Sequence, residues 1–395
     1  MNILTVTEQY WPEGGGGTLA THLIVDVLSR FSDMEIRVIS GTREPIRVDG
    51  VRYICTLLLR TKNKVKLWSN LVFLSKQEWF VKLLRSTDVV YISRYCYPLI
   101  PVAKKLGKRV VVHLHDYQPI SWSAVVFPRN RDHKEEVVKY ELLEHSSIVK
   151  AFIGTMLTYP STFLCRKWLS KADTIICVSK KQAEIISYSA SELKDKLTVI
   201  YNPLPRIPEL RDKFNEPTLI YSGGSSYVKG FYVFLRTLLK VSKQVSKVKF
   251  LLTGARNYNK RDLEFLKTLH ISKGIKFLGR LPYAEVLKLY AKSYAVLVPS
   301  IWEEPLPYVV MESMASGTIP IASNVGGIPE IVEDTYAKKV LFNPGNVEEL
   351  KGHIESVLSM NKSELIAIGY QLRKHVKKKF SSRTLRKRLL NVFLS

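Results

Sequence analysis

The chain has 395 residues, of which 46% are hydrophobic and 24% charged, and its mean hydropathy is −0.02. These values are typical of a soluble globular protein, and the length suits two domains with separate cores. Four scattered cysteines without a CxxC pair argue against a disulfide framework or a zinc site and favour reduced thiols. The net charge of +25 and the pI near 9.7 call for an anionic partner or surface.

The first predicted strand, Asn2–Thr7, leads into a glycine-rich turn, Gly14–Gly17, and a helix that begins near Thr18. Glycines let the backbone approach a ligand closely, and the start of a helix favours anions. Taken alone, such a turn is more often ordinary turn chemistry than a site. The chain starts directly in strand-like sequence, without a charged segment, an apolar core and a cleavage site, so we expect no secretory signal.

Short strands rich in Val and Ile alternate with helical segments along both halves of the chain, and this alternation predicts parallel doubly wound sheets. The residues 202–217 between the halves contain four prolines and read as a linker. We therefore predict two Rossmann-like domains, 1–207 and 208–375, that face each other across a cleft. A basic helix, 376–395, is predicted to pack back on the first domain. Ligands of such sheets bind at the carboxyl ends of the strands.

Residues 60–85 combine seven basic residues with Trp68, Phe73, Trp79 and other apolar side chains, and contain only one acid, Glu78. A basic amphipathic segment of this kind is able to lie on an anionic membrane surface. The alternative is a helix that packs its apolar face on the sheet and turns its lysines to water. The apolar segment 148–164 is interrupted by Lys150 and Pro160, and we expect it to fall short of a transmembrane span.

Residues 299–332 are the most informative stretch of the second half. An apolar strand, Tyr294–Val298, precedes a short loop and a predicted helix, Tyr308–Ser316, which Gly317 and Pro320 end. The start of this helix is an anion site, yet two carboxylates, Glu304 and Glu312, flank it. Carboxylates beside phosphates suit a ligand with hydroxyl groups next to its phosphates, and a nucleotide sugar is such a ligand.

The stretch resembles the signature of retaining family-4 glycosyltransferases (glycosyl transferases group 1) over Pro299-Ser300, Glu304, Glu312, Ala315, Gly317, Pro320 and Gly326-Gly327-Ile328-Pro329-Glu330. The resemblance implies the GT-B fold and a nucleotide-diphospho-sugar donor, UDP- or GDP-linked. In that family the first Glu contacts the donor hexose and the second the ribose, roles that fall on Glu304 and Glu312. Leu306, Pro307 and Tyr308 form the helix start that faces the phosphates. Pro307 stands where relatives commonly carry Gly.

The resemblance assigns further residues to the donor site. Gly15, Gly16 and Gly17 correspond to the glycine loop beside the diphosphate, and His115 to the cleft histidine that approaches the transferred sugar. A strand-end histidine is otherwise often a packed or capping residue. In the segment Gly223-Gly224…Lys229-Gly230, Gly224 occupies the place of an Arg in relatives, which leaves Lys229 as the predicted cation for the diphosphate. Gly254 and Arg280 are the candidates for the nucleotide-base pocket.

The chemistry implied is transfer with retention. No residue stands out as a carboxylate nucleophile, so we expect the acceptor to attack on the face from which the diphosphate leaves, with that phosphate accepting its proton. The catalytic candidates are His115, Glu304 and Lys229. The sequence contains no DxD triplet, and we predict no metal and no cofactor beyond the donor as co-substrate.

The preferred hypothesis is a cytoplasmic hexosyltransferase, peripheral on the inner face of a membrane, that acts on a lipid-linked or envelope-glycan acceptor. A soluble transferase that acts on a small sugar or protein is the first alternative. A different class, a basic nucleic-acid-binding protein or an inactive sugar-nucleotide-binding protein, is the second. Nucleic acid is disfavoured because the basic residues form no known nucleic-acid module. The sequence leaves the oligomeric state open.

Overall fold

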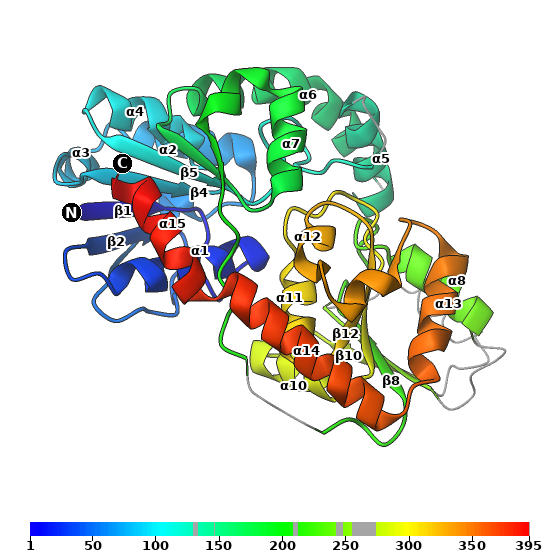
Figure 1. Cartoon of the computed structure of the whole chain (residues 1–395). Coiled ribbons are helices and arrows are strands. Elements are labelled where there is room, and N and C mark those ends of the chain that lie inside the picture. Colours follow the sequence, from blue (N-terminus) through cyan, green and yellow to red (C-terminus); the bar gives the residue numbers. More distant parts are fainter. Residues whose placement is uncertain (129–132, 146, 208–211, 242–247, 255–273, 395) are drawn as a thin grey trace.

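Two parallel β-sheets, each with its own helices, make up the computed structural model (Figure 1). It describes residues 1–128, 133–145, 147–207, 212–241, 248–254 and 274–394. The first sheet has the strand order β3-β2-β1-β4-β5-β6-β7. Its strands are β1 (Asn2–Val6), β2 (Glu35–Ser40), β3 (Arg52–Cys55), β4 (Val89–Ser93), β5 (Arg109–Leu114), β6 (Thr174–Cys177) and β7 (Leu197–Val199). The central strands are buried on both faces, which is why they read as continuous apolar runs.

Helices cover both faces of the first sheet. They are α1 (Gly16–Ser29), α2 (Lys64–Leu74), α3 (Glu78–Arg85), α4 (Ile100–Lys105), α5 (His133–His145), α6 (Ile148–Leu169) and α7 (Lys180–Ser189). Buried side chains of α2, α3, α4 and α6 share one apolar core with β4 and β5, whereas α1 packs into the other. The arrangement is that of a doubly wound domain.

The second sheet is also parallel, with the order β10-β9-β8-β11-β12-β13. Its strands are β8 (Thr218–Tyr221), β9 (Lys249–Thr253), β10 (Ile275–Gly279), β11 (Ala295–Val298), β12 (Ile319–Ser323) and β13 (Leu341–Phe342). Its helices are α8 (Phe231–Val241), α10 (Tyr283–Lys292), α11 (Tyr308–Ala315), α12 (Ile328–Val332), α13 (Val347–Leu358) and α14 (Lys362–Phe380). The apolar face of α8, with Phe231, Phe234 and Leu238 buried, packs into the core of this domain.

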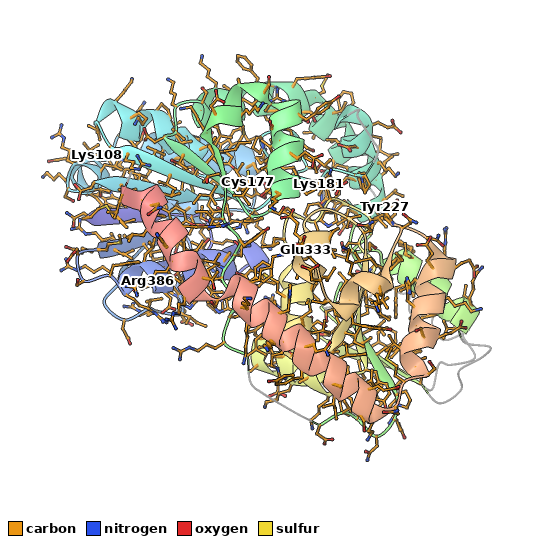
Figure 2. The ribbon with its side chains drawn as sticks, viewed as in Figure 1. Lys108, Cys177, Lys181, Tyr227, Glu333 and Arg386 are labelled. Carbon is orange, nitrogen blue, oxygen red and sulfur yellow. The ribbon has the colours of Figure 1, made fainter. Side chains whose placement is uncertain are left out.

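The chain passes between the domains twice, and the two crossings touch. The Leu204 N–H donates to the Phe380 carbonyl at 2.8 Å, and the ring of Tyr201 packs edge-on against Phe380. Beyond the second crossing, α15 (Ser382–Leu394) lies beside α1 on the first domain, where the Arg386 guanidinium stacks 4.1 Å from the Phe31 ring centroid (Figures 1 and 2). The predicted basic helix 376–395 therefore comprises the end of α14 and all of α15. The predicted boundary at residues 207 and 208 adjoins residues outside the described part.

Four details differ from the sequence expectations. The edge strand β3 was not predicted, because its RYIC sequence is half exposed and lacks an apolar run. The segment 60–85 forms two helices, and the Lys64 ammonium turns inward to Gln118 and the Trp122 carbonyl instead of facing water or a membrane. The run Lys339–Phe342 predicts a strand, which is reduced to Leu341–Phe342 because Tyr336–Val340 forms a 3₁₀ turn.

The fourth difference concerns the apolar segment that was expected to fall short of a membrane span. Pro160 does not end the helix, and α6 runs from Ile148 to Leu169, 22 residues in all. By length and composition it is long and apolar enough to cross a membrane, so the expectation was wrong on those two criteria. The core helix of a soluble protein passes the same test.

Candidate active site

A cavity of about 320 Å³ lies between the carboxyl ends of the two sheets. In each sheet it adjoins the place where the strand order reverses, between β1 and β4 in the first and between β8 and β11 in the second, which is where doubly wound folds bind ligands. The first domain and the linker contribute Gly16, Gly17, His115, Val178 and Asn202 to the wall. The second domain contributes Tyr221–Gly223, Lys229, Leu297, Val298, Ser300, Trp302 and Glu304–Val309.

Two helix N-termini meet at this cavity, one from each domain. Helix α1 begins at Gly16 and α11 at Tyr308, and neither has a side-chain cap. A Cβ at Gly16 would lie 3.1 Å from the Tyr308 ring, so the glycine allows the two helix starts to approach closely. The first N–H groups of a helix have no partner within the helix and carry its positive dipole end. Both helix starts therefore favour an anion in the cavity.

A buried carboxylate faces the same space. Glu304 Oε1 accepts from Lys229 Nζ at 2.7 Å and from Ser300 Oγ at 2.7 Å, and its side chain is only 4% exposed. The Lys229 ammonium also lies 5.2 Å from the centroid of the Trp302 ring. Burial of a single unpaired carboxylate would be strongly unfavourable, so Lys229 neutralises Glu304 in this arrangement. Because 40% of the Lys229 side chain is exposed, its ammonium has room to move to another anion.

His115 lies directly after β5 and its half-buried ring packs against that of His113, with the ring centroids 4.2 Å apart. Burial lowers the pKa of His115 well below its usual value, and the positive charge of Arg94 acts in the same direction. The imidazole is therefore neutral at pH 7. Its Nε2 has no hydrogen-bond partner among the described residues. Because His115 lines the cavity, this buried nitrogen without a partner is the candidate for a hydrogen bond to a ligand hydroxyl.

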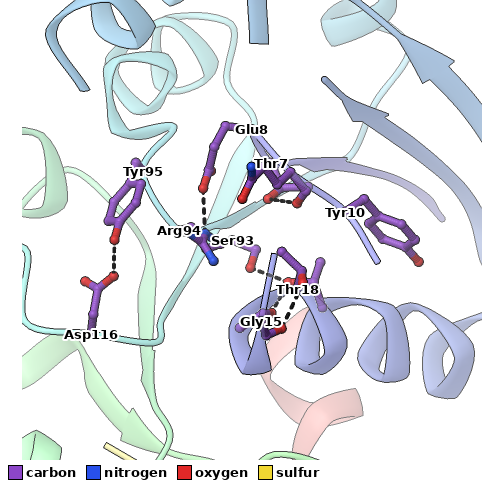
Figure 3. A network of polar contacts seen from close by, with 12 residues as sticks. Thr7, Glu8, Tyr10, Gly15, Thr18, Ser93, Arg94, Tyr95 and Asp116 are labelled. Carbon is purple, nitrogen blue, oxygen red and sulfur yellow. Dashed lines mark hydrogen bonds and ion pairs between the residues drawn. The ribbon is translucent and has the colours of Figure 1, made fainter. Parts of the chain in front are cut away.

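A buried ion pair supports the first-domain side of the cavity. Arg94, directly after β4, donates from Nε to Glu8 Oε1 at 2.5 Å, and the neighbouring Tyr95 Oη donates to Asp116 at 2.6 Å (Figure 3). Arg94 has a φ of +71°, which a residue with a side chain rarely adopts. Its Nη1 lies 3.4 Å from where a Cβ at Gly17 would be. The strained backbone therefore aims a guanidinium at the start of α1.

Glu312 lies one turn along α11 from Tyr308 and is buried in the second domain. It accepts a hydrogen bond from Tyr283 Oη at 2.6 Å. Burial raises its pKa to about 7, and the Tyr283 hydrogen bond opposes part of this effect. The ring of Tyr283 packs edge-on against Trp11 of the first domain, with ring centroids 5.2 Å apart. Glu312 is therefore coupled through Tyr283 to the contact between the domains.

Comparisons with known proteins find glycosyltransferases among the relatives of this chain. Residues 207–375 match the model of the family glycosyl transferases group 1. An uncharacterized glycosyltransferase of Methanocaldococcus jannaschii is 25% identical over 278 residues, which cover 65% of this chain and 69% of that protein. The O-antigen chain mannosyltransferase of Salmonella typhimurium is 24% identical over 195 residues, 49% of this chain and 54% of that protein.

Two solved structures share the whole fold. Sucrose-phosphate synthase from Thermosynechococcus elongatus superposes with a TM-score of 0.76 at 17% identity, covering 99% of this chain and 98% of that one. Anabaena HepE in complex with UDP and glucose superposes with a TM-score of 0.70 at 16% identity, covering 100% and 99%. The predicted GT-B fold is confirmed. Together these matches support a group 1 glycosyltransferase.

The cavity brings together most of the residues that the sequence singled out. Those in its wall are Gly16, Gly17, His115, Gly223, Lys229, Glu304, Leu306, Pro307 and Tyr308. Five others lie outside that wall: Gly15, Gly224, Gly254, Arg280 and Glu312. Within the described ranges, no group of three or more His, Cys, Asp and Glu side chains could hold a metal ion.

Of the residues outside the wall, the three glycines lie beside residues that line it, whereas Arg280 does not. Gly15 caps α1, and the Gly224 N–H donates to the Thr253 carbonyl at 3.2 Å. A Cβ at Gly254 would lie 3.1 Å from the Gly224 nitrogen, so the two candidate glycines are neighbours. Residues 255–273, which follow Gly254, lie outside the described part. Arg280 lines a separate cavity of about 590 Å³, whose other walls include Glu8 and Glu13 of the first domain.

Sequence reasoning missed several contributors. Ser300 and Trp302 lie inside the recognised motif. Their residue types did not predict that Ser300 bonds to Glu304 or that the Trp302 ring lies beside Lys229. Arg94 carried a usable signal, because it directly follows the run Asp88–Ser93, whose Val and Ile residues predict a strand, and this strand (β4) adjoins the reversal point of the sheet. Glu330 closes the motif but does not line the cavity. Its carboxylate accepts from the N–H groups of Lys180 and Lys181 at 3.0 and 2.8 Å, and so caps α7 of the other domain.

The motif glycine Gly326 has a steric role that can be tested. Its φ is +52°, and a Cβ there would lie 1.9 Å from the Glu304 carbonyl oxygen. Gly326→Ala should therefore lower the free energy of unfolding by about 2 kcal/mol or more, measured by urea titration. Gly352→Ala is the matched control, because that helical glycine has open space around it and should gain about 0.5–1 kcal/mol. Equal effects would show that the loop accommodates a side chain.

Proposed function

We propose that the protein is a retaining family-4 glycosyltransferase that transfers a hexose from a UDP- or GDP-linked donor. The single observation that carries this proposal is the Glu304–Lys229 pair, which lies in a cavity between two helix N-termini. The helix starts provide an anion site for a diphosphate, and a carboxylate beside them suits sugar hydroxyls. The solved structure of Anabaena HepE with UDP and glucose supports the same class of donor.

Donor binding would redistribute the charges of the pair. The diphosphate competes with Glu304 for Lys229, and the two helix starts favour its position. Lys229 moves to the phosphates, and Glu304 then exchanges its bond from the ammonium for bonds from hexose hydroxyls. Each charge keeps a partner throughout, so the buried carboxylate is never left uncompensated.

Transfer breaks the anomeric C–O bond, and negative charge develops on the diphosphate while positive charge develops on the sugar. Lys229 and the start of α11 stabilise the first of these charges. The neutral His115 offers Nε2 to a sugar hydroxyl without adding a positive charge beside the cationic sugar. The acceptor hydroxyl attacks from the leaving-group face and gives its proton to the departing phosphate, which gives retention without a metal.

For the acceptor we propose a lipid-linked or envelope glycan, with the enzyme peripheral on the cytoplasmic face of a membrane. Two observations support this choice. The net charge is +25, and the nine Lys and Arg residues that follow Glu364 have no acid among them. One relative is an O-antigen chain mannosyltransferase.

Calorimetry with UDP, GDP and ADP tests the proposal and fixes the donor class. One diphosphate should bind at a single site, and the assigned nucleotide sugar should then be consumed with an acceptor glycan. If none of the three binds, the transferase proposal fails. An NMR assignment of the product anomer tests the stereochemistry separately, because an inverted product would overturn retention and leave donor binding intact.

The pH dependence of donor binding is a further expected outcome. Glu312 has a pKa of about 7, so it is mostly protonated at pH 6 and mostly ionised at pH 8. An ionised carboxylate accepts from ribose hydroxyls, whereas a protonated one offers fewer acceptor sites. The nucleotide sugar should therefore bind about tenfold more tightly at pH 8 than at pH 6, as measured by calorimetry.

The Glu312→Gln variant is the control for this prediction, since its amide does not titrate and its binding should stay flat over the same range. A nucleotide sugar is the probe because the terminal phosphate of a free nucleoside diphosphate itself titrates near pH 6. Wild-type binding that does not change between pH 6 and 8 would contradict the assignment of Glu312 to the ribose.

A further inference from the structure

Helix α6 has an inverted distribution of side chains. Its large apolar residues are exposed: Ile148, Val149, Phe152, Ile153, Met156, Tyr159, Phe163 and Leu164. Its buried residues are small or weakly polar: Ala151, Gly154, Thr158, Ser161, Thr162 and Cys165, with Leu169 at the end. A surface helix of a soluble protein normally buries its apolar stripe and exposes its polar one. The exposed face of α6 is therefore an apolar patch that indicates an interaction site.

The contacts of the buried face fix this orientation. A Cβ at Gly154 would lie 2.9 Å from Val137 of α5 and 3.2 Å from Trp122, so only glycine permits the close approach of α6 to its neighbours. The hydroxyls of Thr158 and Thr162 donate to carbonyls of α6 itself, four residues earlier, at 2.7 Å. Rotation of the helix to bury its large residues would break this packing. The large apolar residues consequently remain outward.

The charges around α6 distinguish between possible partners. The helix contains no acidic residue, and its basic residues, Lys150, Arg166 and Lys167, lie toward its two ends. On the neighbouring α5, Glu136 and Glu144 are turned inward, where they accept from the N–H groups of Phe127 and Val228. An apolar face with cations at its ends matches an anionic bilayer surface, where apolar side chains enter the acyl boundary and cations meet the headgroups.

Helices α2 and α3 carry further exposed apolar and basic residues. Trp168 of α6 packs edge-on against Trp68 of α2, with ring centroids 5.1 Å apart, so the two helices are neighbours. Helices α2 and α3 expose Val72, Phe73 and Trp79. Lys66, Lys76 and Lys82 lie in or between these two helices. The apolar surface of α6 is thus accompanied by a second basic and apolar segment.

We propose that the exposed face of α6 is seated in the interface of an anionic membrane, with the helix lying along the surface. The proposal rests on the proposed function for the membrane and names the surface that contacts it. A span is disfavoured because Ala151, Gly154 and Cys165 hold one whole side of the helix against the first domain. A second copy is disfavoured because a twofold α6–α6 contact would bring cations together without an acid on either helix.

Placement of α6 in the membrane has a consequence for the acceptor. Helix α5 packs along α6, and its Glu144 bonds to Val228, the residue that precedes Lys229. The α5–α6 hairpin therefore reaches from the membrane surface to the edge of the cavity. The glycan of a lipid-linked acceptor would reach the cavity along this hairpin while its lipid stays in the bilayer.

Cosedimentation of the full chain with vesicles tests the surface. The vesicles are phosphatidylcholine with about one-third phosphatidylglycerol. The Phe152→Glu, Met156→Glu double variant should lose more than tenfold of the vesicle partition coefficient, because two apolar side chains one helical turn apart become charged. The matched control is Tyr232→Glu, Leu239→Glu, an exposed apolar pair on α8 of the second domain, which should bind vesicles as the wild type does.

The depth to which α6 enters the membrane is measured with a fluorophore attached to Ile153→Cys. The background is Cys55→Ser, because Cys55 is the exposed cysteine among the described residues and would also be labelled. An environment-sensitive fluorophore on the thiol introduced by Ile153→Cys should shift to the blue with these vesicles, whereas the same fluorophore on the exposed Leu239→Cys of α8 should not. Calorimetry with the nucleoside diphosphate should be unchanged in the α6 variant, so a fault in the donor site is distinguished from a fault in the surface. The proposal is overturned if the wild type fails to bind, if the α6 variant binds equally well, or if the variant only dissociates an oligomer.

Discussion

Replacement of Lys229 by methionine should lower kcat by about 10²–10³-fold, the usual effect of removing one group that stabilises transition-state charge. The reason is local: Lys229 is the predicted cation for the departing diphosphate, and Gly224 stands where relatives carry an Arg. Methionine keeps the length and much of the volume of the side chain. The rate of sugar transfer, measured at saturating donor, is the readout.

Two controls accompany this variant. Lys240 is an exposed lysine of the nearby helix α8 and pairs with Glu348. Lys240→Met should therefore leave kcat unchanged. Lys229→Met also leaves Glu304 buried with only Ser300 as a partner, so some loss of stability is expected and must be measured by urea unfolding. Transfer at the wild-type rate by a folded Lys229→Met protein would remove Lys229 from the mechanism.

The sequence was sufficient for the fold because its signals were local. Runs such as Arg109–Leu114 and Tyr294–Val298 lie in the middle of parallel sheets. Because both faces of such a strand are buried, its sequence is a continuous apolar run that can be recognised. The edge strand Arg52–Cys55 has water on part of its surface, so its composition carries no such signal. The length of helix α6 was underestimated for a different reason. Pro160 weakens a helix on average, but tertiary packing overrides this propensity in α6.

The candidate site could be predicted only in part. The motif residues Glu304 and Lys229 were singled out one by one, but their 2.7 Å bond to each other depends on the loops after β11 and β8. The glycine loop could not be resolved residue by residue, because the choice depends on which glycine faces Tyr308 and which faces His115. Arg94 and Trp302 were missed because their roles arise from contacts between elements far apart in the chain.

The contacts between the domains could not be predicted from the sequence either. Glu330 was recognised as a motif residue, and a ligand role would have been the natural reading. The structure instead places its carboxylate at the N-terminus of α7, and Tyr201 donates to it at 2.9 Å. The motif predicts a carboxylate at this position, but the groups that it binds depend on how the two domains pack against each other.

Replacement of Glu304 by glutamine should separate catalysis from donor binding more sharply than any other change. Glutamine keeps the shape and the contact with Ser300 but no longer holds Lys229 by charge. Lys229 is then free for the diphosphate, so the nucleoside diphosphate should bind as tightly as in the wild type or more tightly. Turnover should nevertheless fall by about 10²–10³-fold, because the charge beside the cationic sugar is lost.

Calorimetry and transfer rates on the same preparation give both quantities, and Glu303→Gln is the neighbouring control. Glu303 accepts from the Gly326 N–H and does not line the cavity, so its change should affect stability more than turnover. The Lys229→Met, Glu304→Gln double variant should be less impaired than the product of the two single effects, because both members of one pair are removed together. If the two single effects on turnover simply multiply in the double variant, the pair does not work as a unit. If the Glu304→Gln protein binds the nucleotide weakly but turns over normally once saturated, Glu304 holds the donor without acting on the sugar.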